Sequence, residues 1–285
     1  MFNIYTAVIT PITNDRINNV EFTNIINEQL TNNCIPILFG STGEGNLISL
    51  EDKCAFLSNL DCKERVYIGV GGYNLEEINL QMCKYIDLGY NKFMISPPPY
   101  SRPTQEGLYQ YFNRIFTTYR NQKFLLYNIP SRTSVDILPE TGIRIIRENP
   151  NLIGIKEASG KINYLHEYIN FRDNYQPDFQ VMSGNDTEFK DAIDLNANGL
   201  VSVASNICPQ YMYYLLSNPN NDFTYFNQLV ELLFVESNPS PTKYILFKLN
   251  KISNFDVKLP LVPLSIPNQN RINNFLHNDI SNLYL

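Results

Sequence analysis

Short apolar runs, rich in β-branched or aromatic residues, recur along the chain at intervals of roughly 25 to 30 residues. Their sequences are almost continuously hydrophobic, which is typical of parallel strands covered on both faces. They predict eight strands, at residues 5–12, 34–40, 65–72, 92–99, 124–130, 152–159, 179–184 and 199–206.

The segments between these runs carry apolar residues at helical spacing. Ser49 and Asp52 form a start that resembles a capping box, and Asn74 precedes acidic residues in a first turn. Helices are therefore expected at residues 19–30, 49–60, 74–89, 105–120, 161–175 and 185–199. This alternation predicts an α/β fold, a (β/α)8 TIM barrel. The alternative is an open, doubly wound sheet, which usually has fewer strands and a glycine-rich nucleotide loop after the first one. Here that loop reads PITNDRIN.

Beyond about Asn220 the pattern changes to helices only, over residues 222–236, 240–252 and from 267 onward. The segment SNPNND before them has the composition of a linker. We therefore expect a barrel over residues 1–220 and a small C-terminal helical domain over 221–285.

Charge and composition exclude several classes of partner. The formal net charge is -6, the pI is about 5.1 and no long basic run occurs, which argues against nucleic acid as a partner. No apolar run approaches the length of a membrane span. The N-terminal segment lacks the basic region and cleavage site of a signal peptide, so a cytoplasmic location is expected.

Cysteine and histidine offer little for metal or triad chemistry. The five cysteines are scattered, without a C-x-x-C pair, and are read as free thiols. The two histidines, His166 and His277, are isolated in segments that read as helical surface. Because a zinc site or a Ser-His-Asp triad needs histidine in the pocket, no metal is expected.

Barrel active sites lie at the C-terminal ends of the strands. One strand ends at Lys156, and side chains alternate faces along a strand. If Ile153 and Ile155 face the helices, Lys156 shares the barrel interior with Gly154, which leaves space beside the amine. Desolvation favours the neutral form of an amine, a nucleophile that forms Schiff bases with carbonyl compounds. The alternative is a strand-end lysine whose ammonium reaches solvent.

Other strand ends supply hydroxyls and a cation. Tyr127 occupies the matching position on the strand before Lys156, and its hydroxyl could relay protons through Ser41 and Thr42. Arg132 could bind a substrate carboxylate. Each has a simpler structural interpretation: a core aromatic residue, a tight turn in GSTGE, and a surface arginine.

Taken in order, these motifs resemble the dihydrodipicolinate synthase family, within the superfamily of pyruvate-dependent Schiff-base aldolases that includes N-acetylneuraminate lyase. The resemblance runs from AVITPIT near Ala7 to NPSPTKYIL at Asn238. It implies a barrel lyase that needs no metal or organic cofactor and assembles as a homodimer or homotetramer.

The resemblance assigns roles to individual residues. Lys156 in GIKEASG matches the lysine that binds pyruvate as an imine, and Tyr127 in YNIPSRT matches the proton-relay tyrosine. In GSTGE, Thr42 matches a contact to the pyruvate carboxylate and Ser41 matches the link in the relay. Synthases usually have threonine at the Ser41 position, and lyases often have serine. Serine keeps the hydroxyl that the relay needs, but this position does not separate the two groups. Tyr100 matches a tyrosine that reaches across a dimer interface into the partner's site.

Three further positions belong to the substrate pocket on the same grounds. Arg132 matches the arginine that holds the carboxylate of the aldehyde substrate, and Val201 matches a backbone carbonyl that lines the pyruvate pocket. Gly184, at the end of the seventh predicted strand, is expected in the same pocket. Arg132 favours a short, charged aldehyde, aspartate-semialdehyde. The resemblance then implies synthesis of 4-hydroxy-tetrahydrodipicolinate on the route to diaminopimelate and lysine.

Alternatives from other classes stay open. The chain could be a lyase or aldolase of the same superfamily that acts on N-acetylneuraminate or 2-keto-3-deoxygluconate. It could be a metal-dependent barrel enzyme, which a chelator would inactivate. It could also be a non-catalytic protein on the same fold, since a fold does not imply a function.

The resemblance also raises the question of whether lysine inhibits the protein, because many synthases of the family bind lysine in a cleft at the dimer interface. Most of the matching positions hold different residues here, namely Gly45, Asn46, Leu50, Lys53, Tyr73 and Pro99. Glu77 alone is retained. A register shift of one residue would place Asn74 where Tyr73 stands. A bulky Tyr73 and a cationic Lys53 disfavour a cationic ligand, so weak or absent inhibition by lysine is expected.

Overall fold

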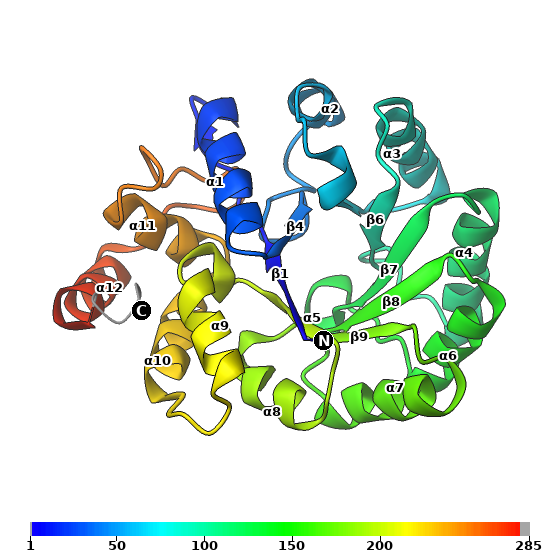
Figure 1. Cartoon of the computed structure of the whole chain (residues 1–285). Helices are drawn as coiled ribbons and strands as arrows, with labels where there is room; N and C mark the ends of the chain where they lie inside the picture. The colour runs from blue at the N-terminus through cyan, green and yellow to red at the C-terminus, as the bar shows by residue number, and fades with distance from the viewer. Residues whose placement is uncertain (1, 280–285) are drawn as a thin grey trace. The chain divides into compact units, whose positions relative to one another are not determined.

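The eight predicted strands are present in a computed structural model, which describes residues 2–279 (Figure 1). They form a closed parallel barrel in the order β1-β10-β9-β8-β7-β6-β5-β4. The expected TIM barrel is confirmed, and closure of the sheet excludes the open alternative. The strands are β1 (Asn3–Ala7), β4 (Ile35–Leu38), β5 (Tyr67–Val70), β6 (Lys92–Ile95), β7 (Lys123–Asn128), β8 (Leu152–Glu157), β9 (Gln180–Ser183) and β10 (Gly199–Ser202).

The helices follow the sequence pattern closely where polar side chains cap them. Ser49 accepts a hydrogen bond from the backbone N–H of Asp52, and Asn74 accepts one from that of Glu77. The predicted helices correspond to α1 (Asn19–Thr31), α2 (Leu50–Ser58), α3 (Leu75–Asp87), α4 (Gln105–Thr118), α7 (Ile162–Tyr175) and α8 (Phe189–Asp194). Sequence analysis missed α5 (Pro130–Thr133), α6 (Pro139–Glu148) and α9 (Pro209–Ser217). Each of these begins with proline, which suits a first helical turn but reads as a loop signal.

The chain divides into two compact units. The first contains the residues up to Asn3 together with Cys62–Val201. In this unit α4, α6 and α7 lie along the outer side of β7, β8 and β9 (Figure 1). Its core includes Phe93, Phe116 and Phe124, and the ring centroids of Phe116 and Phe124 lie 4.8 Å apart.

The second unit contains Ile4–Asp61 and the chain from Ser202 onward. It includes the expected C-terminal helices α10 (Thr224–Leu233), α11 (Ser240–Lys248) and α12 (Ile266–Asp279). These helices share a unit with residues 4–61, and the domain boundary at 220/221 stays a prediction.

The loop PITNDRIN, also in the second unit, is a β-hairpin of β2 (Ile12–Thr13) and β3 (Arg16–Ile17). Its turn residues Asn14 and Asp15 have φ angles of 51° and 62°. Positive φ at both central positions is the geometry of a tight type I′ turn, which asparagine and aspartate tolerate.

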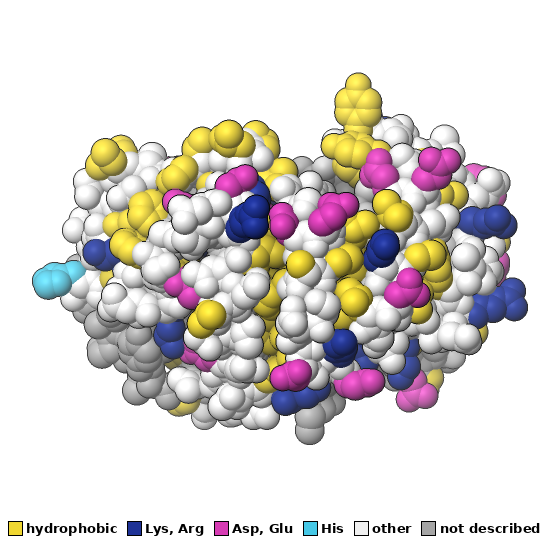
Figure 2. Space-filling model, turned by 90° about the horizontal axis from the view of Figure 1, so that it is seen from above, with side chains coloured by type: hydrophobic (Ala, Val, Ile, Leu, Met, Phe, Trp, Pro, Cys, Tyr) yellow, Lys and Arg dark blue, Asp and Glu magenta, His cyan; other side chains and the backbone are white. Residues whose placement is uncertain are grey.

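The surface carries both signs of charge. On the face drawn in Figure 2, acidic and basic side chains are interspersed and separated by uncharged ones. Within residues 2–279, no helix is long and apolar enough to cross a bilayer.

Candidate active site

Lys156 and Tyr127 lie side by side near the C-terminal ends of β8 and β7. The parallel register pairs them directly, and the Nζ atom of Lys156 lies 4.2 Å from the centroid of the Tyr127 ring. Lys156 is 5% exposed and Tyr127 is 6% exposed. The interpretation of Lys156 as a lysine that reaches solvent is therefore wrong, because the surrounding barrel covers its side chain.

Gly184, directly after β9, provides the space for the Lys156 side chain. A Cβ atom at this position would lie 2.6 Å from both the Cε atom of Lys156 and the Cβ atom of Ala158. The sequence analysis gave this role to Gly154, but a Cβ atom there would instead meet Gln180 and Leu125. Any larger residue at 184 would displace the lysine.

The face of β7 and β8 opposite this pair is polar and buried. Glu157 is 2% exposed, and its carboxylate accepts hydrogen bonds from the side chain of Asn128 and the backbone N–H of Ser159. Burial raises the pKa of Glu157 to about 7, and these hydrogen bonds oppose the shift. Sequence analysis did not single out Glu157 or Asn128, although each directly follows a proposed site residue.

The other predicted residues of the first unit occupy distinct positions. Arg132 lies on α5 with its side chain exposed. Val201 is fully buried in β10. Tyr100 is 88% exposed and has a φ angle of 75°, at the centre of a turn in which Ser101 N–H donates to the Pro99 carbonyl over 2.9 Å. A left-handed tyrosine is rare and strained, and such strain concentrates at functional sites.

Ser41 and Thr42 belong to the second unit, in the tight turn that follows β4. A Cβ atom at Gly45 would lie 1.8 Å from the carbonyl oxygen of Phe39, so only glycine fits there. Ser41 is partly exposed, whereas Thr42 is buried. The hydroxyl oxygen of Thr42 accepts a hydrogen bond of 2.8 Å from the side-chain amide of Asn238.

An ion pair between Glu44 and Lys243 connects the same turn to α11. Both side chains are almost fully buried. Glu44 also accepts from the backbone N–H of Lys258, and Lys243 donates to the carbonyl of Asp256. Burial lowers the pKa of Lys243, while the charge of Glu44 opposes that shift. The sequence around Lys243 did not predict this ion pair, because its two residues are far apart along the chain and leave no local pattern.

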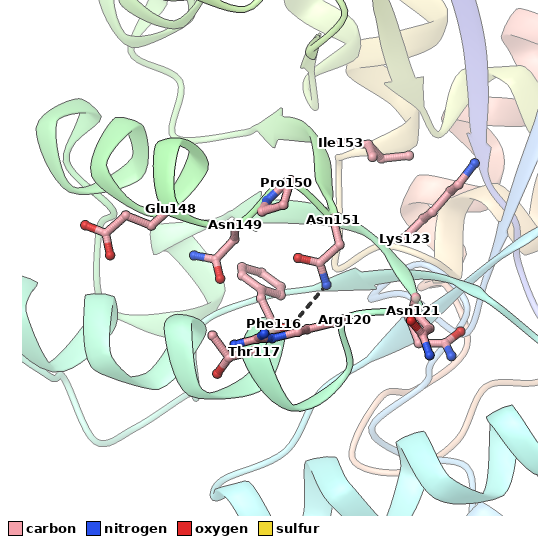
Figure 3. Close-up of a pocket in the computed structure, with 11 residues that line it drawn as sticks. Phe116, Thr117, Arg120, Asn121, Lys123, Glu148, Asn149, Pro150, Asn151 and Ile153 are labelled. Carbon is pink, nitrogen blue, oxygen red and sulfur yellow. Dashed lines mark hydrogen bonds between the residues drawn. The ribbon is translucent and has the colours of Figure 1, made fainter.

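A pocket of about 520 Å³ in the first unit lies at the N-terminal ends of β7 and β8 (Figure 3), whereas Tyr127 and Lys156 lie near their C-terminal ends. Its wall includes Arg120, Lys123 and Asn151, and Asn151 donates a hydrogen bond to the carbonyl of Phe116. The N-terminal face of a TIM barrel serves stability rather than catalysis. No group of three or more potential metal-ligating side chains occurs in the described part of the chain.

Comparison with known proteins agrees with this geometry. Residues 1–279 match the model of the dihydrodipicolinate synthetase family. The chain belongs to this family. Its members are Schiff-base-forming lyases of the class I aldolase type, so the protein is an enzyme of that class.

Individual relatives support the same assignment. The chain is 33% identical to 4-hydroxy-tetrahydrodipicolinate synthase of Thermotoga maritima, over 91% of this chain and 92% of the relative. The corresponding enzyme of Fervidobacterium nodosum is also 33% identical, over 90% and 91% of the two chains.

Solved structures show the same fold. The crystal structure of dihydrodipicolinate synthase from Thermotoga maritima matches with a TM-score of 0.91 at 31% identity, over 98% of each chain. A structure described as the first monomeric dihydrodipicolinate synthase variant matches with a TM-score of 0.91 at 30% identity, over 97% of this chain and 96% of the variant.

The Glu44–Lys243 pair yields a test of stability. Replacing Lys243 by methionine leaves the carboxylate of Glu44 buried without its cation, which should lower the free energy of unfolding by about 3–5 kcal/mol. Lys248→Met, an exposed position on the same helix, should change it by less than about 0.5 kcal/mol. Denaturant unfolding of both variants gives the comparison, and equal stabilities would show that the pair contributes nothing.

Proposed function

We propose that the protein is a 4-hydroxy-tetrahydrodipicolinate synthase, which condenses pyruvate with aspartate-semialdehyde. The observation that carries the proposal is the buried Lys156, in register with Tyr127 at the C-terminal end of the barrel. Membership of the family, whose members use pyruvate, and the synthase names of the relatives agree with it.

The reaction follows from the chemistry of a buried amine. The Nζ atom of Lys156 attacks the keto carbon of pyruvate and releases water, which gives an imine. Loss of a methyl proton forms the enamine, and its carbon attacks the aldehyde of the second substrate. The amine of that substrate then attacks the imine carbon, closes the ring and displaces Lys156.

Proton transfers in this sequence need a relay, which we assign to the hydroxyl of Tyr127 with those of Ser41 and Thr42. Tyr127 is buried beside the amine that it would serve. Ser41 and Thr42 directly follow the C-terminal end of β4, and TIM-barrel active sites lie at such strand ends. Gly184 and Val201 would line the pyruvate pocket.

A second candidate is cleavage of a keto sugar acid by the same imine chemistry. Lyases of the superfamily often have serine at the Ser41 position, and this residue by itself does not separate the two activities. Release of pyruvate from N-acetylneuraminate or 2-keto-3-deoxygluconate would identify this activity. Arg132 favours the synthase, because its exposed guanidinium suits a short substrate with a carboxylate.

Trapping of the imine tests the proposal directly. Incubation with pyruvate and borohydride should add one reduced pyruvyl group to Lys156 and abolish activity, as peptide mass spectrometry would show. Lys123→Ala, an exposed lysine at the other end of the barrel, should label fully. Full labelling of Lys156→Ala would mean that another lysine forms the imine.

Arg132 should act on the second substrate. Arg132→Ala is expected to lower kcat/KM for aspartate-semialdehyde by about 10- to 150-fold, since a charge-assisted contact contributes roughly 1.5–3 kcal/mol. Imine formation with pyruvate should be nearly unchanged. Arg120→Ala, at the opposite end of the barrel, serves as the control. Unaltered kinetics for the aldehyde in Arg132→Ala would point to a different second substrate.

The hydroxyl of Tyr100 should contribute to catalysis only in an oligomer. Its 88% exposure and strained backbone suit a side chain that enters a neighbouring subunit's site. Tyr100→Phe is expected to slow turnover by at least about tenfold without lowering the melting temperature, because it removes a proton-transferring hydroxyl. Tyr73→Phe, another exposed tyrosine, should have no such effect. A fully active monomer in sedimentation experiments would contradict this role.

Lysine should inhibit weakly, with half-inhibition above about 1 mM. Glu77 already accepts hydrogen bonds from the backbone N–H of Tyr73 and the side chain of Asn74. Lys53 is buried, donates to the carbonyl of Gly45 over 3.0 Å, and has its pKa lowered by burial to about 8. Activity measured against rising L-lysine, with D-lysine as control, checks this expectation. Half-inhibition by L-lysine alone in the micromolar range would show a functional cleft.

A further inference from the structure

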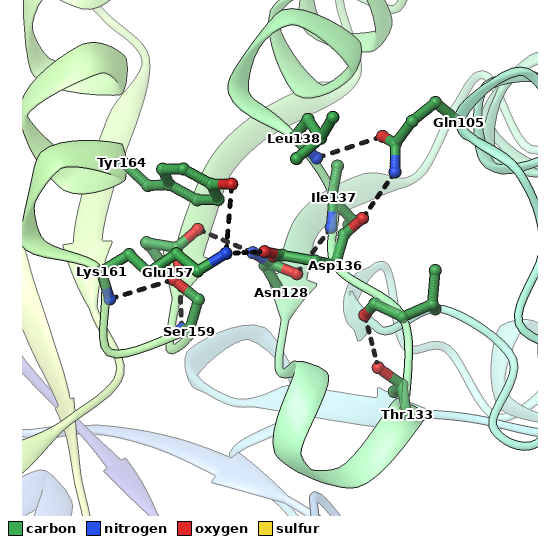
Figure 4. Close-up of polar contacts among 11 residues, drawn as sticks. Gln105, Asn128, Thr133, Asp136, Ile137, Leu138, Glu157, Ser159, Lys161 and Tyr164 are labelled. Carbon is green, nitrogen blue, oxygen red and sulfur yellow. Dashed lines mark hydrogen bonds and ion pairs between the residues drawn. The ribbon is translucent and has the colours of Figure 1, made fainter.

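A buried polar network lies on the face of β7 and β8 opposite to Lys156 and Tyr127. The register that pairs those two residues also pairs Asn128 with Glu157, one position further along each strand. The Nδ2 group of Asn128 donates to Glu157 over 3.0 Å and to Asp136 over 2.8 Å. Figure 4 shows Asn128 between the two carboxylates. One side-chain amide thus connects the ends of both strands to the loop after α5.

Further hydrogen bonds fix the orientation of the side chains in this network. The Oδ1 atom of Asn128 accepts from the backbone N–H of Ile137, so the orientation of its amide is determined. The second oxygen of Glu157 accepts from the N–H of Ser159 over 2.6 Å. Gln105 donates to the carbonyl of Asp136 and accepts from the N–H of Leu138 (Figure 4). Movement of the Glu157 carboxylate would therefore disturb both strand ends.

The carboxylates of Asp136 and Glu157 differ in their partners. Asp136 pairs with the ammonium of Lys161 over 2.7 Å, and Lys161 also approaches the hydroxyl of Tyr164. Glu157 has no ion-pair partner among residues 2–279, and both its oxygens accept N–H groups. Burial, with a smaller contribution from the Asp136 charge, raises its pKa to about 7.

Other titratable groups surround Glu157 from the neighbouring elements. Tyr168 on α7 is fully buried, and its hydroxyl has no hydrogen-bond partner in the described chain. Burial raises the pKa of Tyr168 well above its usual value, and the charge of Glu157 adds to this shift. On β9 the register partner of Glu157 is Ser183, whose hydroxyl donates to Glu188.

We propose that Glu157 is a positioning residue, whose ionised carboxylate holds Asn128 and so keeps Lys156 and Tyr127 aligned for reaction. The inference rests on the reactive role of Lys156 in the function proposed above. Glu157 does not itself touch the reacting atoms, because alternation along β8 directs it to the opposite face from Lys156.

Protonation of Glu157 would weaken this network. Both oxygens accept hydrogen bonds, and a proton converts one of them into a hydroxyl, which is a poorer acceptor. The complete network therefore forms as the pH rises through about 7. The folded protein holds this proton more tightly than the unfolded chain, so the contribution of Glu157 to stability falls as the pH rises from 4.5 toward 7. Above about pH 7 the network is therefore complete, while the contribution of Glu157 to the free energy of unfolding is smaller than at pH 4.5.

Glu157→Gln provides the test, because glutamine has nearly the same shape but presents an NH2 group where one acceptor is needed. Glu167→Gln, an exposed glutamate on α7, removes the same charge nearby and is the matched control. Two readouts are taken between pH 5.5 and 9: the rate of borohydride trapping of pyruvate, and the rate of methylation of Lys156 by formaldehyde and cyanoborohydride. The second readout does not depend on pyruvate as a substrate.

In the unmodified protein and in Glu167→Gln, both rates should show a step near pH 7. In Glu157→Gln that step should disappear, and pyruvate trapping at pH 8 should fall by about tenfold, the loss expected for one charge-assisted hydrogen bond. Retention of the step in Glu157→Gln, with only a changed melting temperature, would overturn the proposal. Absence of pyruvate trapping with the formaldehyde step intact, and lost in Glu157→Gln, would refute the proposed function and support the positioning role.

Discussion

The parallel register between β7 and β8 is the constraint on which the candidate site depends. It places Tyr127 beside Lys156 on one face of the barrel wall and Asn128 beside Glu157 on the other. A slip of one residue would exchange these faces, moving the lysine toward α6 and α7 and the carboxylate into the barrel. The same backbone hydrogen bonds therefore position both the reactive pair, Lys156 and Tyr127, and the polar pair behind it, Asn128 and Glu157.

Three buried polar side chains near the C-terminal ends of β4 and β8 have hydrogen-bond or ion-pair partners. Thr42 has Asn238, Glu44 has Lys243, and Glu157 has the N–H groups of Asn128 and Ser159. Burying such groups unsatisfied would cost free energy, so their partners are as much a part of the site as the reactive atoms. The network around Glu157 gives up some stability to keep a charge in an apolar setting, a compromise that functional sites often make.

Local patterns in the sequence were enough to predict the strands, most of the helices and the position of Lys156, because periodicity and strand ends are local properties. They did not predict α6 and α9, because the proline at the first position of each helix was interpreted as a loop residue. The space beside Lys156 was also misassigned. Gly154 is its neighbour along the strand, but Gly184, directly after β9, is its neighbour in space. The Lys243–Glu44 pair joins distant segments and leaves no pattern in either one.

The contact between Thr42 and Asn238 joins residues 196 positions apart. The turn after β4 thus leaves the ribosome well before α11 and its preceding loop, which must be made before Thr42 and Glu44 gain their partners. Such non-local contacts slow folding, because a long loop must close before they form. During synthesis the carboxylate of Glu44 would therefore stay in water until Lys243 has emerged and can pair with it.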